Sequence, residues 1–153
     1  MDLIQCKSID HFGSTSVPGL VAKPIIDILV GVQRIPMSAA KIRALESLGY
    51  EYVGEAGIPG RFYFRKRQEQ VFNIAIVEWN GRLWKENLLI RDFLRSHPEY
   101  VSKYAELKKA AVSAGITDLL TYPAYKQALM AEILRKARGL RDWHNPRDLG
   151  DMC

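Results

Sequence analysis

The apolar run PIIDILVGV, from Pro24 to Val32, constrains the fold of this chain more than any other stretch. Its Ile and Val content is typical of a strand that is buried on both faces of a sheet. A single acid, Asp27, lies in the middle of the run. Because burying an unpaired carboxylate costs free energy, we expect either a compensating partner for Asp27, such as backbone N–H groups or an Arg, or a functional role.

The hydrophobic period changes from strand-like to helix-like near residue 82. Short apolar or alternating runs predict strands, the last two forming a hairpin, over residues 7–12, 24–32, 50–53, 61–67 and 70–79. The helical period predicts a first helix from the N-cap Ser38 to Gly49 and a second from Leu83 to the SHP sequence. A third helix has Pro98 in its first turn and ends at Gly115, and a fourth covers about 121–137. This order predicts an α+β fold with a small mixed β-sheet and a C-terminal helical segment.

The length of 153 residues favours one domain with one core. We therefore predict a single domain over residues 1–139, sheet-rich over 1–81 and helical over 82–139. The polar sequence after Gly139 predicts an irregular tail over 140–153.

Location and redox state are predicted from what the sequence lacks. It has no run of about 18 apolar residues, and its first residues do not pair a basic start with an apolar block, as an export signal would. We expect a cytoplasmic protein with no membrane partner. The two cysteines, Cys6 and Cys153, lack a CxxC motif, which favours reduced thiols over a zinc site.

The charge of the chain suits an anionic partner without proving one. The formal net charge is +5, which fits a protein that meets nucleotides or other anionic small molecules. Basic residues form no dense block, so charge alone is a weak argument for RNA, which stays a possible partner. The signatures GxxxxGK, GxGxxG, HExxH and GxSxG are absent, which argues against P-loop, Rossmann, zincin and serine-hydrolase mechanisms.

A Gly-Ser turn precedes the Asp27 run. Gly13 and Ser14 can bare backbone N–H groups and a hydroxyl toward an anion. Asp27, on the next strand, can bind a hard cation such as Mg²⁺ against the same phosphate. A turn for the phosphate and an acid for the metal are the minimum set for moving a nucleotidyl or phosphoryl group.

This layout resembles the nucleotidyltransferase superfamily signature, in which Gly-Ser is followed by acids on a strand. The sequence FGS, ending at Ser14, matches the first half. The superfamily places two acids at i and i+2, on one face of the strand. Here Ile25 and Leu29 flank Asp27 at those positions, so one carboxylate is present where two are expected.

A resemblance over nearly the whole chain is more specific. The sequences HFGSTSVPGLVAKPIIDILVGV, LGYEYVGEAGIPGRFYF, NLLIRDFLRSHPE and YAELK resemble the GrpB family of nucleotidyltransferase-like proteins. The resemblance implies a nucleotidyltransferase-like α+β fold. In relatives, the strand aligned with FNIAIVE typically reads similarly to HLHVV, so Asn73 and Ala75 replace two histidines. If those histidines bind metal or carry protons, that chemistry is missing here, although Asn73 can still hydrogen-bond a ligand.

Each remaining candidate residue has a functional and a structural interpretation. Ser14 and Thr15 either contact phosphate or cap the turn. Lys23 either neutralises a phosphate or is a solvated lysine. Arg61 is shaped for bidentate phosphate contact, but it can equally form an ion pair with Glu55 that braces the glycine-rich GEAGIPGR turn.

Four residues are possible site-lining groups: Glu55 and Asn73, named above, and His11 and Arg91. His11 precedes the turn and is either a structural hydrogen-bonding group or part of the site. Arg91 lies on the apolar stripe of a predicted helix and therefore needs an anion, for which Asp27, Glu78 or a ligand phosphate are candidates; we favour a structural ion pair.

Three functions remain open. The first is a nucleotidyltransferase in which Asp27 is catalytic and binds Mg²⁺, while Gly13, Ser14, Thr15, Lys23 and Arg61 bind the nucleotide, for transfer to a small-molecule or RNA acceptor. The second is a catalytically degenerate nucleotide- or anion-binding module, which the missing second carboxylate favours. The third is an interaction protein whose helical half acts in an oligomer. Fold alone does not decide between them.

Overall fold

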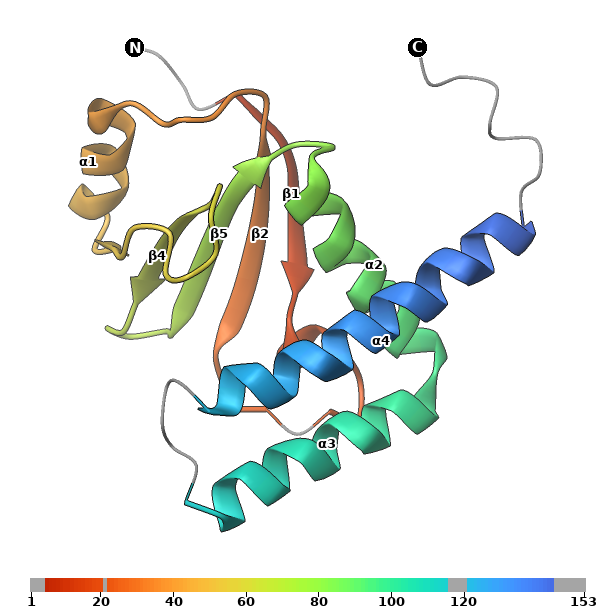
Figure 1. The fold of residues 1–153 in the computed structure, drawn as a ribbon. Coiled ribbons are helices and arrows are strands. Elements are labelled where there is room, and N and C mark those ends of the chain that lie inside the picture. The colour runs from red at the N-terminus through yellow and green to blue at the C-terminus, as the bar shows by residue number, and fades with distance from the viewer. Residues whose placement is uncertain (1–4, 21, 116–120, 145–153) are drawn as a thin grey trace. The chain divides into compact units, whose positions relative to one another are not determined.

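The protein is described by a computed structural model that covers residues 5–20, 22–115 and 121–144 (Figure 1). Its elements in chain order are β1 (Cys6–Phe12), the 3₁₀ turn η1 (Ser14–Ser16), β2 (Ile26–Val32), α1 (Ala39–Ser47), β3 (Glu51–Tyr52), β4 (Phe62–Lys66), β5 (Phe72–Glu78), α2 (Arg82–Ser96), α3 (Pro98–Ser113) and α4 (Thr121–His144). These elements confirm the predicted α+β class.

The strands form one small sheet in the order β1-β2-β5-β4-β3. Strands β2 and β5 are parallel, and the other neighbours are antiparallel. The sheet is therefore mixed, as predicted, and β4 and β5 form the predicted hairpin. The parallel pair lies inside the sheet, with β1 on one side and β4 and β3 on the other. The two strands can be parallel because α1, β3 and β4 connect the end of β2 to the start of β5.

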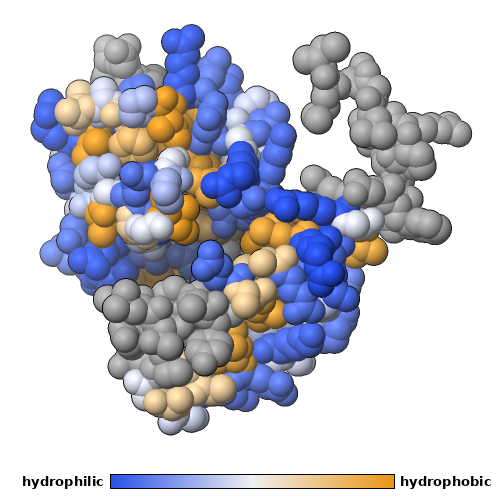
Figure 2. All heavy atoms as spheres, viewed as in Figure 1, coloured by the Kyte–Doolittle hydropathy of each residue, from blue (hydrophilic) through white to orange (hydrophobic). Residues whose placement is uncertain are grey.

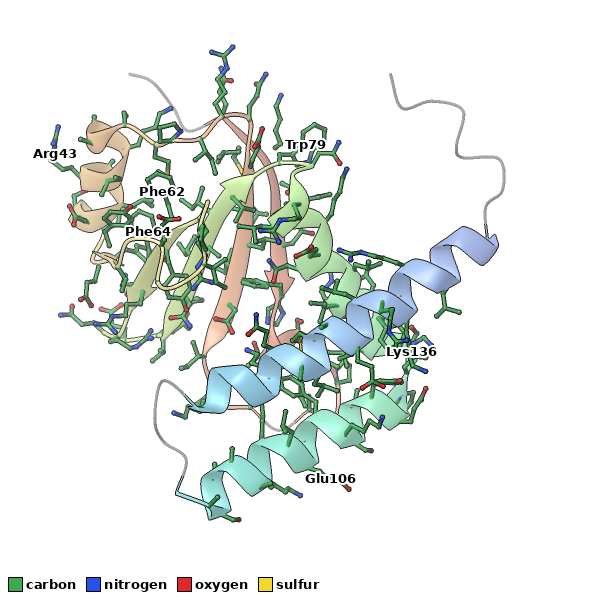
Figure 3. All side chains as sticks on the ribbon, in the orientation of Figure 1. Arg43, Phe62, Phe64, Trp79, Glu106 and Lys136 are labelled. Carbon is green, nitrogen blue, oxygen red and sulfur yellow. The ribbon has the colours of Figure 1, made fainter. Side chains whose placement is uncertain are left out.

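Helix α1 covers one face of the sheet (Figure 1). Ser38 is its N-cap, and its side chain accepts a hydrogen bond from the Lys41 backbone N–H. Phe62 and Phe64 of β4 lie on this face, whereas Arg43 points away from the sheet (Figure 3). The residues that form this core are Val32, Met37, Phe64, Ile74 and Ile76, with partly buried neighbours that include Ile42 and Leu45 of α1.

Helix α2 packs against the other face of the sheet. Leu83, Trp84 and Leu88 pack against a second core made of Leu29, Ala75 and Val77. Because side chains alternate along a strand, Asp27 lies on the same face as Leu29, two residues nearer the start of β2. The acid is thus on the α2 face of the sheet.

Burial along β2 is uneven, which corrects the prediction of a strand buried on both faces throughout. Leu29 is fully buried and Val32 nearly so, but Ile26 is 42% exposed. The two cores that cover the sheet reach the middle and end of β2, whereas its first residues lie beyond them. The Asp27 end of the strand is therefore the more open end.

The chain divides into two compact units, Met1–Arg91 and Asp92–Cys153, and the boundary falls inside α2. In the second unit, Tyr100, Tyr104 and Ala111 of α3 and Ile133 and Ala137 of α4 are buried. Figure 2 shows hydrophobic residues gathered where α3 and α4 run side by side. A single domain over residues 1–139 stays a prediction.

The predicted irregular tail is wrong for its first residues. Helix α4 continues through Gly139 to His144, so residues 140–144 are helical. A glycine inside a helix costs only about 1 kcal/mol relative to alanine, and here it does not end the helix. The rest of the predicted tail, 145–153, lies outside the described residues. Within the described part of the chain, no helix is both long and apolar enough to cross a membrane.

Candidate functional site

The structure brings Gly13 against the carboxylate of Asp27. Phe12, the last residue of β1, is paired with Asp27 on β2, and the chain then turns at Gly13 with φ 73° and ψ −169°. A Cβ atom added to Gly13 would lie 2.9 Å from Asp27 Oδ2. Only glycine readily adopts this backbone conformation, and only glycine leaves room for the acid. The Gly-Ser turn and the solitary acid are therefore neighbours.

Ser16 stabilises the turn through hydrogen bonds, and the sequence analysis did not predict this role. Its hydroxyl donates to the Gly13 carbonyl over 2.6 Å, and its backbone N–H donates to the same oxygen over 3.1 Å. Ser16 is only 5% exposed. These bonds close η1 and fix the position of Gly13. A serine shortly after a glycine is the sequence signal of such a side-chain-closed turn, but many surface serines share it.

Thr15 and His11 are bonded to each other. Thr15 Oγ1 donates to the Ile25 carbonyl over 3.1 Å, and His11 Nε2 lies 2.9 Å from the same Thr15 oxygen. Because Thr15 donates its hydroxyl proton to Ile25, its oxygen accepts from His11. His11 is paired with Ile28, and strand alternation puts both on the face opposite Asp27. These contacts tie Thr15 to Ile25 and to β1, and phosphate contact by Thr15 stays a prediction.

Asn73 is the direct partner of Asp27. The two residues are in register on the parallel strands β5 and β2. Asn73 Nδ2 donates to Asp27 Oδ1 over 2.8 Å, and Asn73 is only 8% exposed. Its Oδ1 atom is buried and has no hydrogen-bond partner among the described residues. The partner that the structure shows for the half-buried acid is thus an amide from the neighbouring strand, in place of a backbone N–H group or an arginine.

Tyr63 and Arg61 form a stacked pair beside this acid. The Arg61 guanidinium lies 4.4 Å from the centre of the Tyr63 ring. Tyr63 is paired with Ala75 and packs with the core of the α2 face. Burial raises the pKa of the Tyr63 hydroxyl, and the negative charge of Asp27 raises it further. Burial lowers the pKa of Arg61, while the charge of Asp27 opposes that shift. Asp27 therefore acts electrostatically on both side chains.

Glu55 and Arg61 brace the glycine-rich turn through its backbone. Glu55 Oε2 accepts from the Gly60 N–H over 2.6 Å, and Arg61 donates to the carbonyls of Glu55 and Ala56 over 2.8 and 2.9 Å. The predicted bracing is present, but it is made by these backbone contacts in place of the ion pair between the two side chains. The turn holds Arg61 in place over Tyr63.

Arg91 has a different partner from those proposed. Its Nη1 atom lies 3.6 Å from Asp10 Oδ1 and donates to the His11 carbonyl over 3.1 Å. The structural ion pair is confirmed, but neither Asp27 nor Glu78 is the acid. Asp10 precedes Phe12 by two residues, so it lies on the Asp27 face of β1. Its Oδ2 atom is buried without a hydrogen-bond partner.

For the other predicted residues, the contacts in the structure do not decide between a functional and a structural role. Lys23 is exposed, and its carbonyl accepts from the Ile25 N–H over 2.7 Å. Ser14 opens η1 directly after Gly13. Ala75 is 2% exposed and belongs to the α2-side core, so the position of the second family histidine is filled by packing.

One carboxylate is the group at this site that could hold a small hard cation. Among the described residues, no group of three or more His, Cys, Asp or Glu side chains is placed to hold a metal ion. The amide of Asn73 turns its nitrogen, not its oxygen, toward Asp27. Magnesium commonly uses one or two protein oxygens and completes its shell with phosphate and water, so a single carboxylate is compatible with it.

Comparison with known proteins identifies the family. The family model described as GrpB protein matches residues 1–136. The chain belongs to the GrpB family. It is 33% identical over 138 residues to "Glutamate-rich protein GrpB" of Alkalihalophilus pseudofirmus, a match that covers 86% of this chain and 79% of that protein.

A second relative is longer. The chain is 40% identical over 103 residues to "UPF0157 protein YqkA" of Bacillus subtilis, which covers 67% of this chain but only 30% of YqkA. The match to "UPF0157 protein PA4798" of Pseudomonas aeruginosa is 36% identical and covers 84% of this chain and 54% of that protein. The chain thus spans less than two thirds of these two relatives.

A solved structure supports the fold. The crystal structure of conserved protein GrpB from Enterococcus faecalis aligns with a TM-score of 0.73 and 35% sequence identity. The alignment covers 92% of this chain and 84% of that one. The small mixed sheet and its helices are therefore the architecture of a GrpB protein.

Proposed function

We propose that this GrpB family protein binds a nucleoside triphosphate with Mg²⁺ at Asp27 and transfers its nucleotidyl group to a small-molecule or RNA acceptor. The observation that carries the proposal is the contact between the Gly13 turn and the Asp27 carboxylate. This closeness supports the proposal, because the superfamily resemblance expects a Gly-Ser turn and a strand acid to act on the same ligand.

The transfer is a single displacement at the α-phosphorus. A hydroxyl or amine of the acceptor forms a bond to this phosphorus, the bond to the β-phosphate oxygen breaks, and pyrophosphate leaves. The acceptor proton passes to water. The protein's part in such a reaction is mostly positioning and charge stabilisation.

The residues of the site have separate tasks in this proposal. Asp27 would hold Mg²⁺, and the cation would neutralise phosphate charge. Gly13 lets the chain approach the ligand because it has no side chain. Arg61, fixed by two carbonyls over the Tyr63 ring, supplies positive charge beside the same acid.

A second function, nucleotide or anion binding without catalysis, is favoured by one observation. The i+2 position that carries the second acid in the superfamily is occupied here by Leu29, which is fully buried in the α2-side core. A carboxylate cannot replace it without entering that core. With one carboxylate on β2, binding would survive where two-metal catalysis would not.

The test is Mg²⁺-dependent nucleotide turnover by the full chain. We expect pyrophosphate release from at least one of ATP, GTP, CTP and UTP in a panel of acceptors, and its loss in Asp27→Asn. Glu46→Gln is the matched control, because Glu46 is exposed on α1 and its substitution removes the same charge. Tight Mg²⁺-dependent nucleotide binding without pyrophosphate release would select the binding module. No nucleotide affinity in any form would reject both functions.

A further inference from the structure

We propose that Arg65 binds a carboxylate of the acceptor, so that the molecule which receives the nucleotidyl group is a small carboxylate with a hydroxyl or an amine. This inference rests on the proposed function and names the chemical class of its second substrate. In this structure the carboxylate of Glu51 is bonded to the guanidinium of Arg65, at the place where the acceptor carboxylate would bind.

Arg65 lies in the same row of the sheet as Asp27. Asp27 is in register with Asn73 on β5, and Asn73 is in register with Arg65 on β4. Side chains in register on neighbouring strands share one face of the sheet, so all three lie on the α2 face. Two strand spacings of about 4.8 Å separate the backbone of Arg65 from that of Asp27. A small molecule can therefore span the two side chains.

The two carboxylate oxygens of Asp27 have neighbours on opposite sides. Oδ2 lies against Gly13, on the β1 side, and Oδ1 accepts from Asn73, on the β5 side. The proposed function assigns the nucleotide phosphates to the Gly13 turn. Because the attacking and leaving oxygens lie roughly in line in such a transfer, the acceptor approaches from the other side of the reacting phosphorus. Arg65 lies on that side, beyond Asn73.

The contact between Arg65 and Glu51 indicates which anion the guanidinium fits. Arg65 Nε donates to Glu51 Oε2 over 2.7 Å, and Nη2 donates to Oε1 over 3.0 Å. Two parallel bonds of this kind are the planar fork that arginine forms with a carboxylate. The side chains of Arg65 and Glu51 are 43% and 60% exposed, and an exposed ion pair is weak. A second carboxylate can therefore replace Glu51 at little cost.

Arg65 differs from the neighbouring arginines in the kind of partner that it has. Arg61 and Arg67 donate to backbone carbonyls, which cannot be released without rearranging the backbone of a loop or strand. Arg65 donates to a side chain on β3, which is a two-residue strand at the edge of the sheet. Rotation of the Glu51 side chain is enough to free the guanidinium. Arg65 is thus suited to exchange one carboxylate for another.

The experiment measures anion binding by the full chain with calorimetry, without turnover. Malonate is the carboxylate probe, malonamide is its neutral analogue, and orthophosphate is the alternative anion. We expect malonate to bind and malonamide not to bind. Glu51→Gln removes the internal competitor and should tighten malonate binding by up to about fivefold, because the exposed ion pair that it replaces is weak. Arg65→Met should weaken malonate binding about tenfold or more.

The matched controls are Arg67→Met and Glu46→Gln. Arg67 carries the same charge two residues further along and donates to the carbonyls of Lys66 and Phe72, whereas Glu46 is exposed on α1. Neither substitution should change the affinity for malonate. Thermal unfolding of the four variants checks that a loss of binding is not a loss of the fold.

A second titration distinguishes the acceptor from the nucleotide. Malonate is added to the protein saturated with Mg²⁺ and α,β-methylene-ATP, in which the bond to the leaving phosphate is not cleaved. We expect malonate to bind at least as tightly as it does without the analogue, because the two ligands lie on opposite sides of Asp27. Competition between them would make Arg65 a residue of the nucleotide site and overturn its assignment to the acceptor.

Other results would also overturn the inference or separate it from the proposed function. If malonate binds neither the unsubstituted protein nor Glu51→Gln, or binds Arg65→Met with unchanged affinity, Arg65 is not a carboxylate-binding residue. If orthophosphate binds through Arg65 and malonate does not, the anionic group is a phosphate and the assignment to a carboxylate is wrong. If malonate binds through Arg65 but the protein has no affinity for the ATP analogue, the proposed function fails together with the acceptor role, while the anion site at Arg65 stands.

Discussion

At the scale of single residues, the orientation of Asp27 is set by neighbours from two other segments. Gly13 lies against Oδ2, and Asn73 donates to Oδ1. Both carboxylate oxygens are thus defined by groups distant in sequence. A carboxylate held in this way presents a fixed direction to a ligand, which is what a cation or phosphate site requires.

Gly13→Ala should cost both stability and ligand binding. The backbone at Gly13, with φ 73° and ψ −169°, is nearly restricted to glycine, so alanine should lose about 1–3 kcal/mol of unfolding free energy. Its methyl group would also push against Asp27 Oδ2. Urea unfolding and Mg²⁺-dependent nucleotide titration check the two effects.

Comparison of Gly13→Ala with Gly19→Ala distinguishes the effect of backbone strain from that of the contact with Asp27. Gly19 also has a positive φ, of 81°, but an added Cβ would meet no atom within 4 Å among the residues that the structure describes. We expect Gly19→Ala to lose stability and keep nucleotide affinity. Equal loss of affinity in both variants would show that strain alone, and not the contact with Asp27, affects the site.

Arg91→Met should destabilise the protein by leaving Asp10 without its cation. Asp10 is half-buried, and its buried Oδ2 atom has no hydrogen-bond partner in the described part of the chain. Breaking a partly buried charged contact while its partner remains costs about 1–3 kcal/mol. Chemical denaturation of Arg91→Met measures this loss.

The control for Arg91 is Arg43→Met. Arg43 is exposed on α1 and points away from the sheet (Figure 3), so we expect a change within about 0.5 kcal/mol. If the two variants have the same denaturation midpoint, the contact between Arg91 and Asp10 contributes nothing to stability.

The sequence predicts some residues of the site and not others, for a physical reason. Gly13 and Asp27 are recognisable because a turn glycine and an acid in an apolar strand violate local rules. Tyr63 breaks no local rule and was not predicted, and Asn73 was a candidate only through the family resemblance. Their place at the acid depends on the register of β5 against β2 and of β4 against β5, which is set by the packed sheet.

At the scale of elements, local pattern was sufficient to predict which segments form strands and helices. The apolar period predicted α1 and its cap at Ser38, and Pro98 opens α3 as expected. Strand order was not predictable in this way. The parallel pairing of β2 with β5 is a contact between segments separated by a helix and two strands, and the extension of α4 past Gly139 depends on continued helical hydrogen bonding.

The pair of helices α3 and α4 should show a pH-dependent stability centred on Glu132. Tyr100 donates to Glu132 Oε1 over 3.0 Å, and Lys103 lies 3.5 Å from the same oxygen. The hydrogen bond from Tyr100 is the main cause that lowers the pKa of Glu132 below its ordinary value of 4.5. A lowered folded-state pKa means that the contact stabilises the fold above pH 4.5 and is lost as the pH falls through the folded value.

Tyr100→Phe should therefore lower stability at neutral pH and flatten the loss of stability on acidification below pH 4.5. Glu132→Gln is the control, because it keeps an acceptor for Tyr100 but cannot titrate, and it should flatten the same acid limb. Denaturant unfolding at several pH values measures both. An acid limb of unchanged slope in both variants would contradict a titrating role for Glu132.

At the scale of the whole molecule, the net charge of +5 invites the idea of an RNA partner, but the site does not concentrate free positive charge. Arg65 donates to both carboxylate oxygens of Glu51 over 2.7 and 3.0 Å. Arg91 is placed at Asp10, and Arg61 donates to two backbone carbonyls. These three arginines are thus engaged within the fold. Composition alone could not reveal this, since it counts charges without their partners.

We therefore expect nucleotide binding to depend only weakly on salt. A ligand that neutralises about two charges should lose about tenfold in affinity between about 50 and 200 mM salt, whereas an RNA held through six to ten phosphates would lose about 10³- to 10⁵-fold. Titration of a nucleoside triphosphate and of a single-stranded RNA across this salt range distinguishes the two.

Arg61→Met tests whether Arg61 causes the weak salt dependence that we expect for nucleotide affinity. If Arg61 supplies the positive charge beside Asp27, its loss should flatten the salt dependence of nucleotide binding, while Arg43→Met, which removes the same charge from α1, should leave the slope unchanged. A steep salt dependence with RNA that Arg61→Met does not alter would move the anionic partner away from this face of the sheet. It would then have to be sought among the other basic residues, because Arg61, Arg65 and Arg91 would have to break their contacts within the fold to bind RNA phosphates.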